Sequence, residues 1–203
     1  MYEDLFIFLK KFSTLTNEEF SRLKESIIIR EFQKKEILIK KGDTEQYLYF
    51  INKGLIHQYF YKGKEMVTTD LVGPGTITGS VSSFLSGKPS NYYLEAMEQT
   101  LVLAMSKQCL EELYNSDKKW QQVGRILITY FLLQQERQLI DNIRFSMRER
   151  FVNFAEASPE LLKRVPQRRL ASYLNIKPET FTRLKPLLAI KHKTASSSQT
   201  KKK

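Results

Sequence analysis

Residues 167–184 read QRRLASYLNIKPETFTRL, a pattern typical of two short helices joined by a tight turn. We expect the first helix over Gln167–Leu174 and the second over Pro178–Lys185. Asn175 opens the turn, where a positive φ is often needed and asparagine tolerates it better than most residues. Pro178 suits the first turn of a helix, because a backbone N–H there has no partner within the helix. The stretch therefore predicts a helix-turn-helix.

The outer face of this motif carries side chains suited to reading DNA. Apolar Ile176, Phe181 and Leu184 are expected to bury the inner face of the second helix. On the outer face of the second helix, a carboxylate can accept a hydrogen bond from cytosine N4 and an arginine can donate two hydrogen bonds to guanine. Hydroxyls there can reach phosphates or base edges. Two arginines at the start of the first helix are placed to grip the DNA backbone. The candidate DNA-binding residues are Gln167, Arg168, Arg169, Glu179, Thr180, Thr182, Arg183 and Lys185.

The charge of the chain is concentrated around this motif. The net charge is +11, but residues 1–117 hold 14 Lys and Arg against 16 Asp and Glu, whereas residues 118–203 hold 19 against 6. Such asymmetry indicates that the second part binds a polyanion. The alternative is an ordinary helical hairpin with a solvated charged face. Pro186 removes a backbone donor, so the second helix should end or kink near Lys185.

Upstream, the pattern predicts helix and then sheet. Residues 5–25 are expected to be helical, and Thr16 followed by Glu19 has the spacing of a capping box. From Ile27 to Ser106, short β runs alternate with turn residues. Many short strands with almost no helix between them predict an antiparallel jelly roll. The expected strands are Ile27–Phe32, Glu36–Ile39, Tyr47–Asn52, Leu55–Tyr61, Met66–Leu71, Tyr92–Ala96 and Leu101–Met105.

A long helix is expected between the two regions, from Ser116 or Asp117 to about Asn142. It is apolar nearly all round, so it should be buried on two sides, one of them by a second copy of the chain. Four of its residues have the three-and-four spacing of a coiled-coil seam. This candidate dimer seam consists of Val123, Ile126, Tyr130 and Leu133. The alternative is a central helix in the core of a monomer.

These observations place the chain in the α+β class and divide it into four parts. The expected parts are a β-roll domain over 1–115, a dimerisation helix over 116–143, a helix-turn-helix DNA-binding domain over 144–190 and a basic flexible tail over 191–203.

In this order of parts, the chain resembles the Crp/Fnr transcription regulators from about Leu5 to Leu188. The family's recognition helix commonly carries Glu-x-x-Ser/Thr-Arg, which Glu179, Thr182 and Arg183 match. The resemblance implies a bacterial-type homodimer that binds double-stranded DNA, and RNA polymerase is expected as a further partner. Besides the helix-turn-helix, three segments carry the resemblance to the family. They are KEILIKKG at 35–42, YFINKG at 49–54 and Gly79–Ala96.

The expected pocket departs from that of the cyclic-AMP-binding members. Their phosphate cassette has Gly-Glu and, some ten residues later, an Arg-Ser pair; the Glu binds the ribose and the Arg binds the cyclic phosphate. Here Ser80 replaces the Glu, Ser90 stands near the Arg, and Lys88 is the cation that could compensate. Loss of the guanidinium would remove a contact of roughly 1.5–3 kcal/mol, so we expect that cyclic AMP is not the ligand.

Another small-molecule effector could still bind this pocket through hydroxyl and amide groups. The alternative is that the serines only shape turns. The candidate effector-pocket residues are Gly79, Ser80, Ser82, Ser83, Ser90, Asn91 and Tyr93.

Catalytic and metal-binding classes are not expected. Cys109 is the only cysteine, which excludes an intramolecular disulfide, a cysteine-built metal site and the oxygen-sensing cysteine cluster of the family. His57 and His192 lie far apart, and a cupin-like enzyme would need a His/Glu cluster. No Ser–His–acid set, P-loop or Gly-rich dinucleotide turn is visible. We therefore expect no enzyme activity, no metal and no cofactor.

Membrane association is not expected either. The longest apolar run, Ile126–Leu133, is far shorter than the ~20 residues of a membrane-spanning helix. The acidic start Met1–Asp4 lacks the pattern of a secretory signal, so we expect a cytoplasmic protein. A second functional class stays open, namely an effector- or protein-binding regulatory module with only non-specific affinity for nucleic acid. Sequence-independent DNA binding would distinguish that class.

Overall fold

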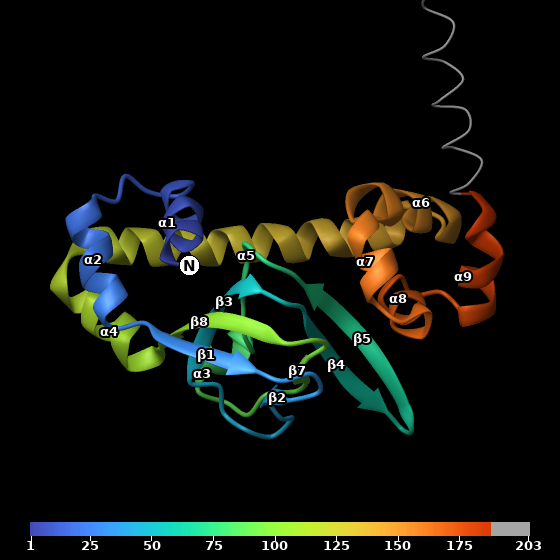
Figure 1. The fold of residues 1–203 in the computed structure, drawn as a ribbon, viewed down its shortest axis with the longest axis horizontal. Coiled ribbons are helices and arrows are strands. Elements are labelled where there is room, and N and C mark those ends of the chain that lie inside the picture. Colours follow the sequence, from blue (N-terminus) through green and yellow to red (C-terminus); the bar gives the residue numbers. More distant parts are fainter. Residues whose placement is uncertain (188–203) are drawn as a thin grey trace, which may run out of the picture. The chain divides into compact units, whose positions relative to one another are not determined.

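The computed structural model describes residues 1–187, which fall into two compact units (Figure 1). The first unit is Met1–Leu133, and the second begins at Gln134. The expected tail 191–203, the last residues of the expected DNA-binding domain and His192 lie outside the described residues.

Two short helices open the first unit, α1 (Tyr2–Lys10) and α2 (Asn17–Glu25). The hydroxyl of Thr16 accepts the backbone N–H of Glu19, and the Glu19 carboxylate accepts the N–H of Thr16 at 2.7 Å. The predicted capping box is confirmed, and it explains where α2 begins.

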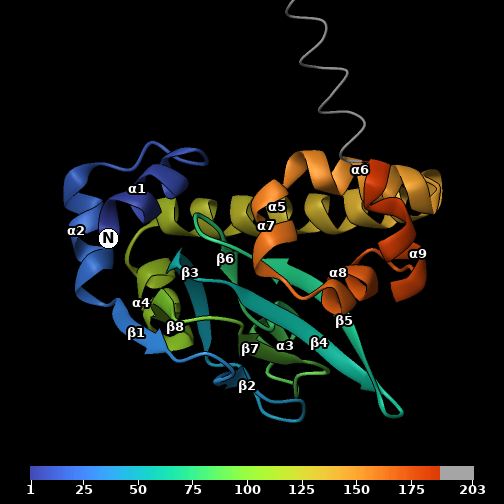
Figure 2. The same cartoon turned by 45° about the vertical axis from the view of Figure 1, so that its right-hand side comes forward.

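Two four-stranded antiparallel sheets follow, in the orders β1-β8-β3-β6 and β2-β7-β4-β5. All seven predicted strands are present, and Figure 2 shows β4 and β5 paired as a long hairpin. The short strand β6 and the helix α3 (Val81–Ser86) were not predicted. The strands are β1 (Ile28–Phe32), β2 (Ile37–Ile39), β3 (Tyr47–Lys53), β4 (Ile56–Lys62), β5 (Glu65–Val72), β6 (Ile77–Thr78), β7 (Tyr93–Ala96) and β8 (Thr100–Ser106).

Both faces of the first sheet are buried at its inner strands β3 and β8. Tyr49 and Val102 share one apolar cluster with Leu94 of the second sheet, so this face lies inside the β-sandwich. Their neighbours Phe50 and Leu103 belong to a second cluster, formed with α1, α2 and the later helices. Since side chains alternate along a strand, this arrangement explains why β3 reads as a nearly continuous apolar run.

The turn between β3 and β4 requires its glycine. Gly54 has a φ of +102°, and a Cβ there would lie 2.6 Å from the Cα of Thr100. Only glycine combines that backbone conformation with such a close approach. Close packing against Thr100 therefore explains why the motif YFINKG ends in a glycine.

Two helices follow the sheets. Ser106 caps α4 (Lys107–Ser116), and α5 (Lys118–Arg144) begins after Asp117. Trp120 and Val123 of α5 are buried in the helical cluster of the first unit. No helix among residues 1–187 is both long enough and apolar enough to cross a membrane.

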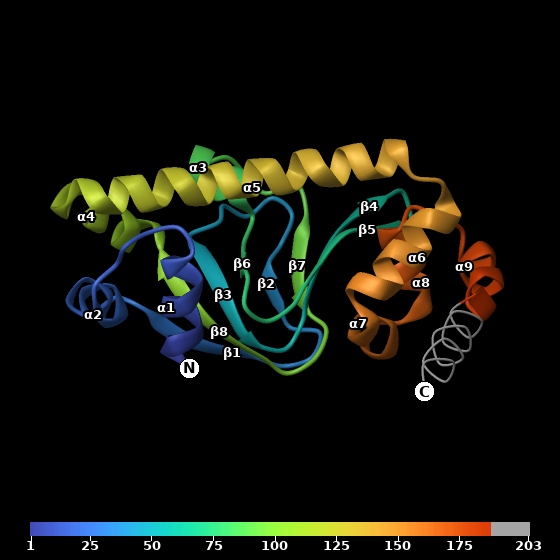
Figure 3. The same cartoon turned by 90° about the horizontal axis from the view of Figure 1, so that it is seen from above.

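The second unit is helical (Figure 3), and its core contains two phenylalanines. The rings of Phe151 and Phe181 are both fully buried, with centroids 5.2 Å apart in an edge-to-face arrangement. Ser146 and Glu149 form a second capping box, which starts α6. After the end of α5, the helices of this unit are α6 (Met147–Ala157), α7 (Pro159–Arg164), α8 (Gln167–Tyr173) and α9 (Pro178–Leu184).

Candidate functional site

The turn between α8 and α9 has the geometry that the sequence predicts. Asn175 has a φ of +52°. The N–H of Leu174 donates to the carbonyl of Leu170, and the N–H of Ile176 donates to the carbonyl of Ala171, both at 2.9 Å. Pro178 occupies the first turn of α9, as predicted. The two helices are therefore held at a defined angle by backbone hydrogen bonds and the αL residue.

Arg150 of α6 fastens this turn to the end of α5 within the second unit. Its Nη1 donates to the carbonyls of Phe145 at 2.8 Å and Asn142 at 3.1 Å. Its Nε donates to the carbonyl of Leu174 at 3.2 Å, and its Nη2 reaches that of Asn175 at 3.5 Å. The planar, multi-donor guanidinium suits this bridging role. No sequence motif pointed to Arg150, because its partners are backbone carbonyls.

The predicted DNA-binding residues of α9 are mostly exposed. Glu179, Thr182 and Arg183 are exposed, and Thr180 is half-buried. Residues three and four apart share one side of a helix, so Arg183 and Glu179 lie on the side away from buried Phe181. The hydroxyl of Thr182 donates to the carbonyl of Pro178 at 3.1 Å, which orients its side chain along the helix.

The remaining predicted residues flank α9. Gln167 and Arg168 are exposed at the start of α8, and Arg169 is half-buried. Lys185 is exposed in a turn directly after α9, which ends at Leu184. Pro186 and Leu187 are helical again after Lys185, so the predicted end or kink near Lys185 is confirmed as an interruption of the helix at that residue.

Part of the predicted dimer seam is buried inside the protein itself and is not free to contact a second copy. Val123 is 3% exposed in the core of the first unit. The ring of Tyr130 packs 5.2 Å from that of Phe12, and Ile126 is half-buried. Of the four seam residues, only Leu133 is exposed.

Four of the six exposed leucine and isoleucine side chains of α5 follow another stripe, which excludes Leu133 and Ile140. Ile128 and Leu132 are exposed in the first unit, and Leu139 and Ile143 in the second. Their separations of four, seven and four residues are those of one helix face. The spacing in the sequence therefore identified a helix but not its free side.

Serines of the predicted effector pocket bind one another. Ser80 precedes α3, and its hydroxyl donates to the Ser90 hydroxyl at 2.9 Å. The Ser90 hydroxyl donates in turn to the carbonyl of Tyr92 at 2.9 Å. Both serines are buried, and the Tyr92 hydroxyl approaches the carbonyl of Gly79. These hydroxyls are therefore used within the protein.

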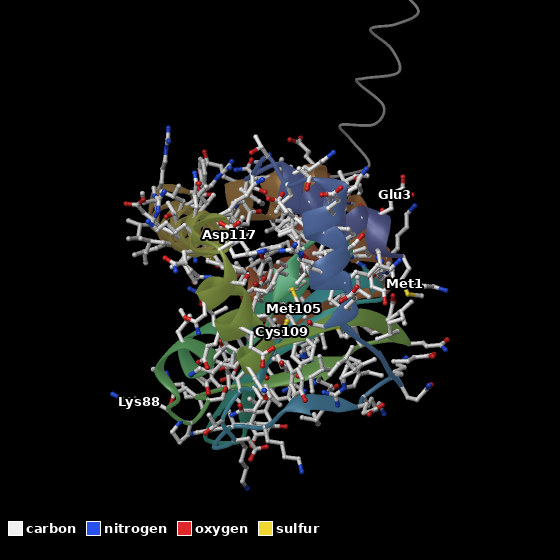
Figure 4. All side chains as sticks on the ribbon, turned by 90° about the vertical axis from the view of Figure 1, so that its left-hand side faces the viewer. Met1, Glu3, Lys88, Met105, Cys109 and Asp117 are labelled. Atoms are coloured by element: carbon white, nitrogen blue, oxygen red, sulfur yellow. The ribbon has the colours of Figure 1, made fainter. Side chains whose placement is uncertain are left out.

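A third serine links the pocket to another loop. The Ser83 hydroxyl accepts the N–H of Glu45 at 3.0 Å and donates to the carbonyl of Lys88. The Lys88 side chain is exposed and points away from the ribbon (Figure 4). Lys88 therefore does not bring its ammonium group into the network to replace the missing arginine.

At the centre of this network lies Glu45, which is 2% exposed. Its carboxylate accepts the backbone N–H groups of Ser80 at 3.1 Å, Gln46 at 3.1 Å and Tyr47 at 3.2 Å. The Tyr49 hydroxyl lies 3.4 Å away as a further donor. Burial raises the pKa of Glu45, although these hydrogen bonds oppose the shift. Sequence reasoning missed Glu45, because an acid in a turn region is usually exposed.

The other predicted pocket residues lie at the edge of this network or outside it. Ser82 and Asn91 are exposed. Tyr93 of β7 stacks on Tyr59, with ring centroids 5.2 Å apart, on the face of the strand opposite to buried Leu94. The structure therefore gathers Gly79, Ser80, Ser83 and Ser90 around Glu45, places the Ser82 side chain in contact with the Tyr92 hydroxyl, and leaves Asn91 and Tyr93 apart.

Glu45→Gln is expected to remove a pH dependence of stability. Because the pKa of Glu45 in the folded state is raised above the ordinary value of 4.5, the folded state holds this proton more tightly than the unfolded state. The wild type should therefore lose stability relative to Glu45→Gln as the pH rises above about 4.5. Urea unfolding at pH 4.5 and pH 7 measures this difference. Glu111→Gln, an exposed change on α4, is the control. The assignment would be contradicted if the stabilities of the wild type and Glu45→Gln differed by the same amount at pH 4.5 and at pH 7.

Within residues 1–187, no three His, Cys, Asp or Glu side chains gather in a way that could hold a metal ion.

Comparison with known proteins relates the first unit to a family. Residues 29–117 match the family model of the cyclic nucleotide-binding domain. The matched region contains both sheets and α3, and with them the serine network around Glu45. No curated protein sequence matches the chain.

Solved structures share the fold over most of the chain. The catabolite activator protein of Thermus thermophilus is 22% identical, with 89% of this chain and 87% of that chain covered and a TM-score of 0.56. FixK2 of Bradyrhizobium japonicum is 18% identical, with coverages of 82% and 86% and a TM-score of 0.67. The regulator CLP of Xanthomonas campestris is 15% identical, with coverages of 85% and 91% and a TM-score of 0.61. The chain thus has the fold of these regulators, and its residues 29–117 match the cyclic nucleotide-binding domain.

Proposed function

We propose that the protein is a homodimeric, sequence-specific DNA-binding regulator of transcription. In this proposal α8 and α9 form a helix-turn-helix whose second helix enters the major groove of double-stranded DNA. The observation that carries it is the exposure of Arg183 and Glu179 on one side of α9, whose other side is fixed by buried Phe181. Arg168, at the start of α8, would contact the phosphate backbone.

The fold comparison supports a role in gene regulation. The Xanthomonas protein is described as a c-di-GMP-responsive global regulator that links cell–cell signalling to virulence gene expression. By analogy of fold, the present chain would act on promoters in the cytoplasm, with RNA polymerase as a further partner.

Cyclic AMP is not the effector in this proposal. The backbone N–H of Ser80, at the start of α3, already donates to the Glu45 carboxylate, and the Ser80 and Ser90 hydroxyls bind each other. A cyclic phosphate would have to displace a buried carboxylate, and no arginine between Gly79 and Tyr92 would compensate for its charge. Any effector of this protein would therefore differ from cyclic AMP.

The dimer would form through the exposed stripe of α5, Ile128, Leu132, Leu139 and Ile143, which we call the α5 stripe. Apolar residues with this spacing pack well against the same stripe of a second helix. Two copies would then present two α9 helices to half-sites about one helical turn of DNA apart, ~34 Å.

Binding to duplex DNA from the gene's own upstream region, compared with a scrambled duplex near 0.15 M salt, tests the function. A preference of about 10³-fold or more is expected for a sequence-specific regulator. Similar and strongly salt-dependent affinities for both duplexes would favour a module that binds DNA only through its phosphates, without reading the sequence.

Arg183→Ala is expected to weaken specific binding by about 1–3 kcal/mol and to relax the preference at one base position. The reason is the loss of a bidentate contact to a guanine, which carries sequence information. Fluorescence anisotropy with a set of single-base operator variants measures both effects. Arg168→Ala is the matched control, because a phosphate contact should weaken all sequences alike. Equal losses on specific and random DNA for Arg183→Ala would contradict base reading.

A further inference from the structure

A single side chain joins the last turn of α5 to the turn that precedes α9. Arg150 is half-buried near the start of α6, which the chain enters directly after the end of α5 (Figure 3). Its Nη1 donates to the carbonyls of Asn142 and Phe145. Its Nε and Nη2 donate to the carbonyls of Leu174 and Asn175. Two pairs of carbonyls from remote segments are therefore held against one rigid, planar group.

The first pair of carbonyls lies where the proposed dimer helix ends. The last carbonyls of a helix have no partner within it, and Asn142 lies in the last turn of α5. The positive guanidinium also suits the negative end of the helix dipole. The next residue, Ile143, is 79% exposed and is the last member of the α5 stripe. Arg150 therefore fixes the part of α5 that would end the dimer interface.

The second pair of carbonyls belongs to the turn that sets the direction of α9. Leu174 directly follows α8, and Asn175 is the αL residue of the turn. A lysine in place of Arg150 would present all its donors on a single nitrogen, which cannot bridge two segments as the fork of an arginine does. The chemistry of the guanidinium, and not only its charge, is therefore what the geometry uses.

We propose that Arg150 is a positioning residue, which fixes the direction of α9 relative to the α5 stripe and thereby the spacing of the DNA half-sites that a dimer reads. This inference rests on the proposed function, since it requires a dimer through α5 and DNA reading by α9. Packing of Phe151 on Phe181 holds α9 on α6. Arg150 adds the link to α5, so its loss should free the direction of α9 relative to α5 and leave the α8–α9 motif folded.

Distances between two spin labels in the full chain test this coupling without DNA. The labels are attached to cysteines introduced at Arg137 of α5 and at Lys177 before α9, both of them exposed. Cys109, the only cysteine of the chain, is first replaced by alanine. Dilution with unlabelled protein leaves only the distances within one chain. Double electron–electron resonance should give one narrow maximum when Arg150 is present, and this maximum should be lost in Arg150→Ala.

Two further variants separate the bridge from charge and from general stability. Arg150→Lys keeps the positive charge at the end of α5 but loses the bridge, so the narrow maximum should be lost in this variant too. Arg148→Gln, at an exposed arginine of the same helix, is the matched control and should keep the maximum. Circular dichroism confirms that each variant is folded. An unchanged narrow maximum in Arg150→Lys, or its equal loss in Arg148→Gln, would overturn the proposal.

Half-site spacing tests what this coupling does for DNA binding. The probe is the duplex from the gene's own upstream region, and a second version carries two more base pairs between the half-sites, which turns one half-site by about 70°. The wild type should bind the second version about 10²-fold more weakly or worse, because only one half-site stays in reach. In Arg150→Lys this spacing penalty should be at least about tenfold smaller. Its affinity for a single half-site should equal that of the wild type, which a general loss of stability would not allow.

The two measurements distinguish failure of this inference from failure of the proposed function. Equal spacing penalties in the wild type and Arg150→Lys would overturn the positioning role of Arg150. Absence of any sequence-specific binding by the wild type would refute the proposed function and, with it, the consequence for half-site spacing. The spin-label distances would still decide whether Arg150 couples α9 to α5.

Discussion

Leu132→Glu combined with Leu139→Glu is expected to convert the proposed dimer into monomers. The two side chains are 67% and 62% exposed and stand seven residues apart on the α5 stripe. A dimer through this stripe would bury four carboxylates without partners, each at a cost of several kcal/mol. Because 1.4 kcal/mol corresponds to tenfold, dimer affinity should fall by more than about 10³-fold. Light scattering coupled to size-exclusion chromatography measures the mass.

A second pair on the same helix gives the matched control. Leu133 and Ile140 are also exposed and also seven residues apart, but each follows a stripe residue by one position and so lies about 100° round the helix. Leu133→Glu combined with Ile140→Glu should leave the mass unchanged. A monomer from this control pair alone would move the interface to the side of Leu133. Unchanged mass in both double variants would refute a dimer through α5.

The contrast between these two stripes shows what the sequence could predict about α5. The three-and-four spacing of its apolar residues predicts a helix, and α5 extends to Arg144, close to the expected Asn142. The side that it buries depends on distant elements, since Tyr130 packs on Phe12 and Phe8 near the N-terminus. Periodicity alone carries no information about such partners.

The sheets were largely predictable for a local reason. Alternating apolar residues and Gly-containing turns occur within each strand and its neighbouring loop, so the signal is present in short windows. The strand β6 was missed because its ladder is only Ile77–Thr78. The helix α3 was missed because its sequence VSSFLS is rich in serine, and its cap at Ser80 lacks a side-chain hydrogen bond.

The candidate site likewise contains residues that the local sequence predicted and residues that it did not. Asn175 and Pro178 determine the turn locally, and both expectations about them are confirmed. Glu45 and Arg150 act through backbone groups of remote segments, 35 residues away in the case of Ser80 and 24 in that of Leu174. Residues that bind backbone atoms of remote segments leave no pattern in the sequence, because any residue of the remote segment can supply the partner.

Phe181→Ala is expected to destabilise the second unit by about 3–5 kcal/mol, which is typical when a fully buried phenylalanine is truncated. Phe181 packs edge-to-face on Phe151, and both rings are inaccessible to solvent. Several kcal/mol is a large share of the stability of a small domain. Specific DNA binding should therefore be lost, because α9 would no longer be held against α8.

Urea unfolding with two probes separates this effect from general misfolding. Trp120 is the only tryptophan and lies in the first unit, so its fluorescence reports that unit, whereas far-ultraviolet circular dichroism reports all helices. In Phe181→Ala, part of the dichroism should be lost at lower urea while the Trp120 transition stays in place. Phe154→Ala, at a half-buried ring 5.6 Å from that of Tyr173, is the control and should shift the transition less.

Coincident transitions of both probes in Phe181→Ala would mean that the two units unfold as one, because coincident probes are the mark of two-state unfolding. Loss of DNA binding in that variant could then not be assigned to the α8–α9 motif alone.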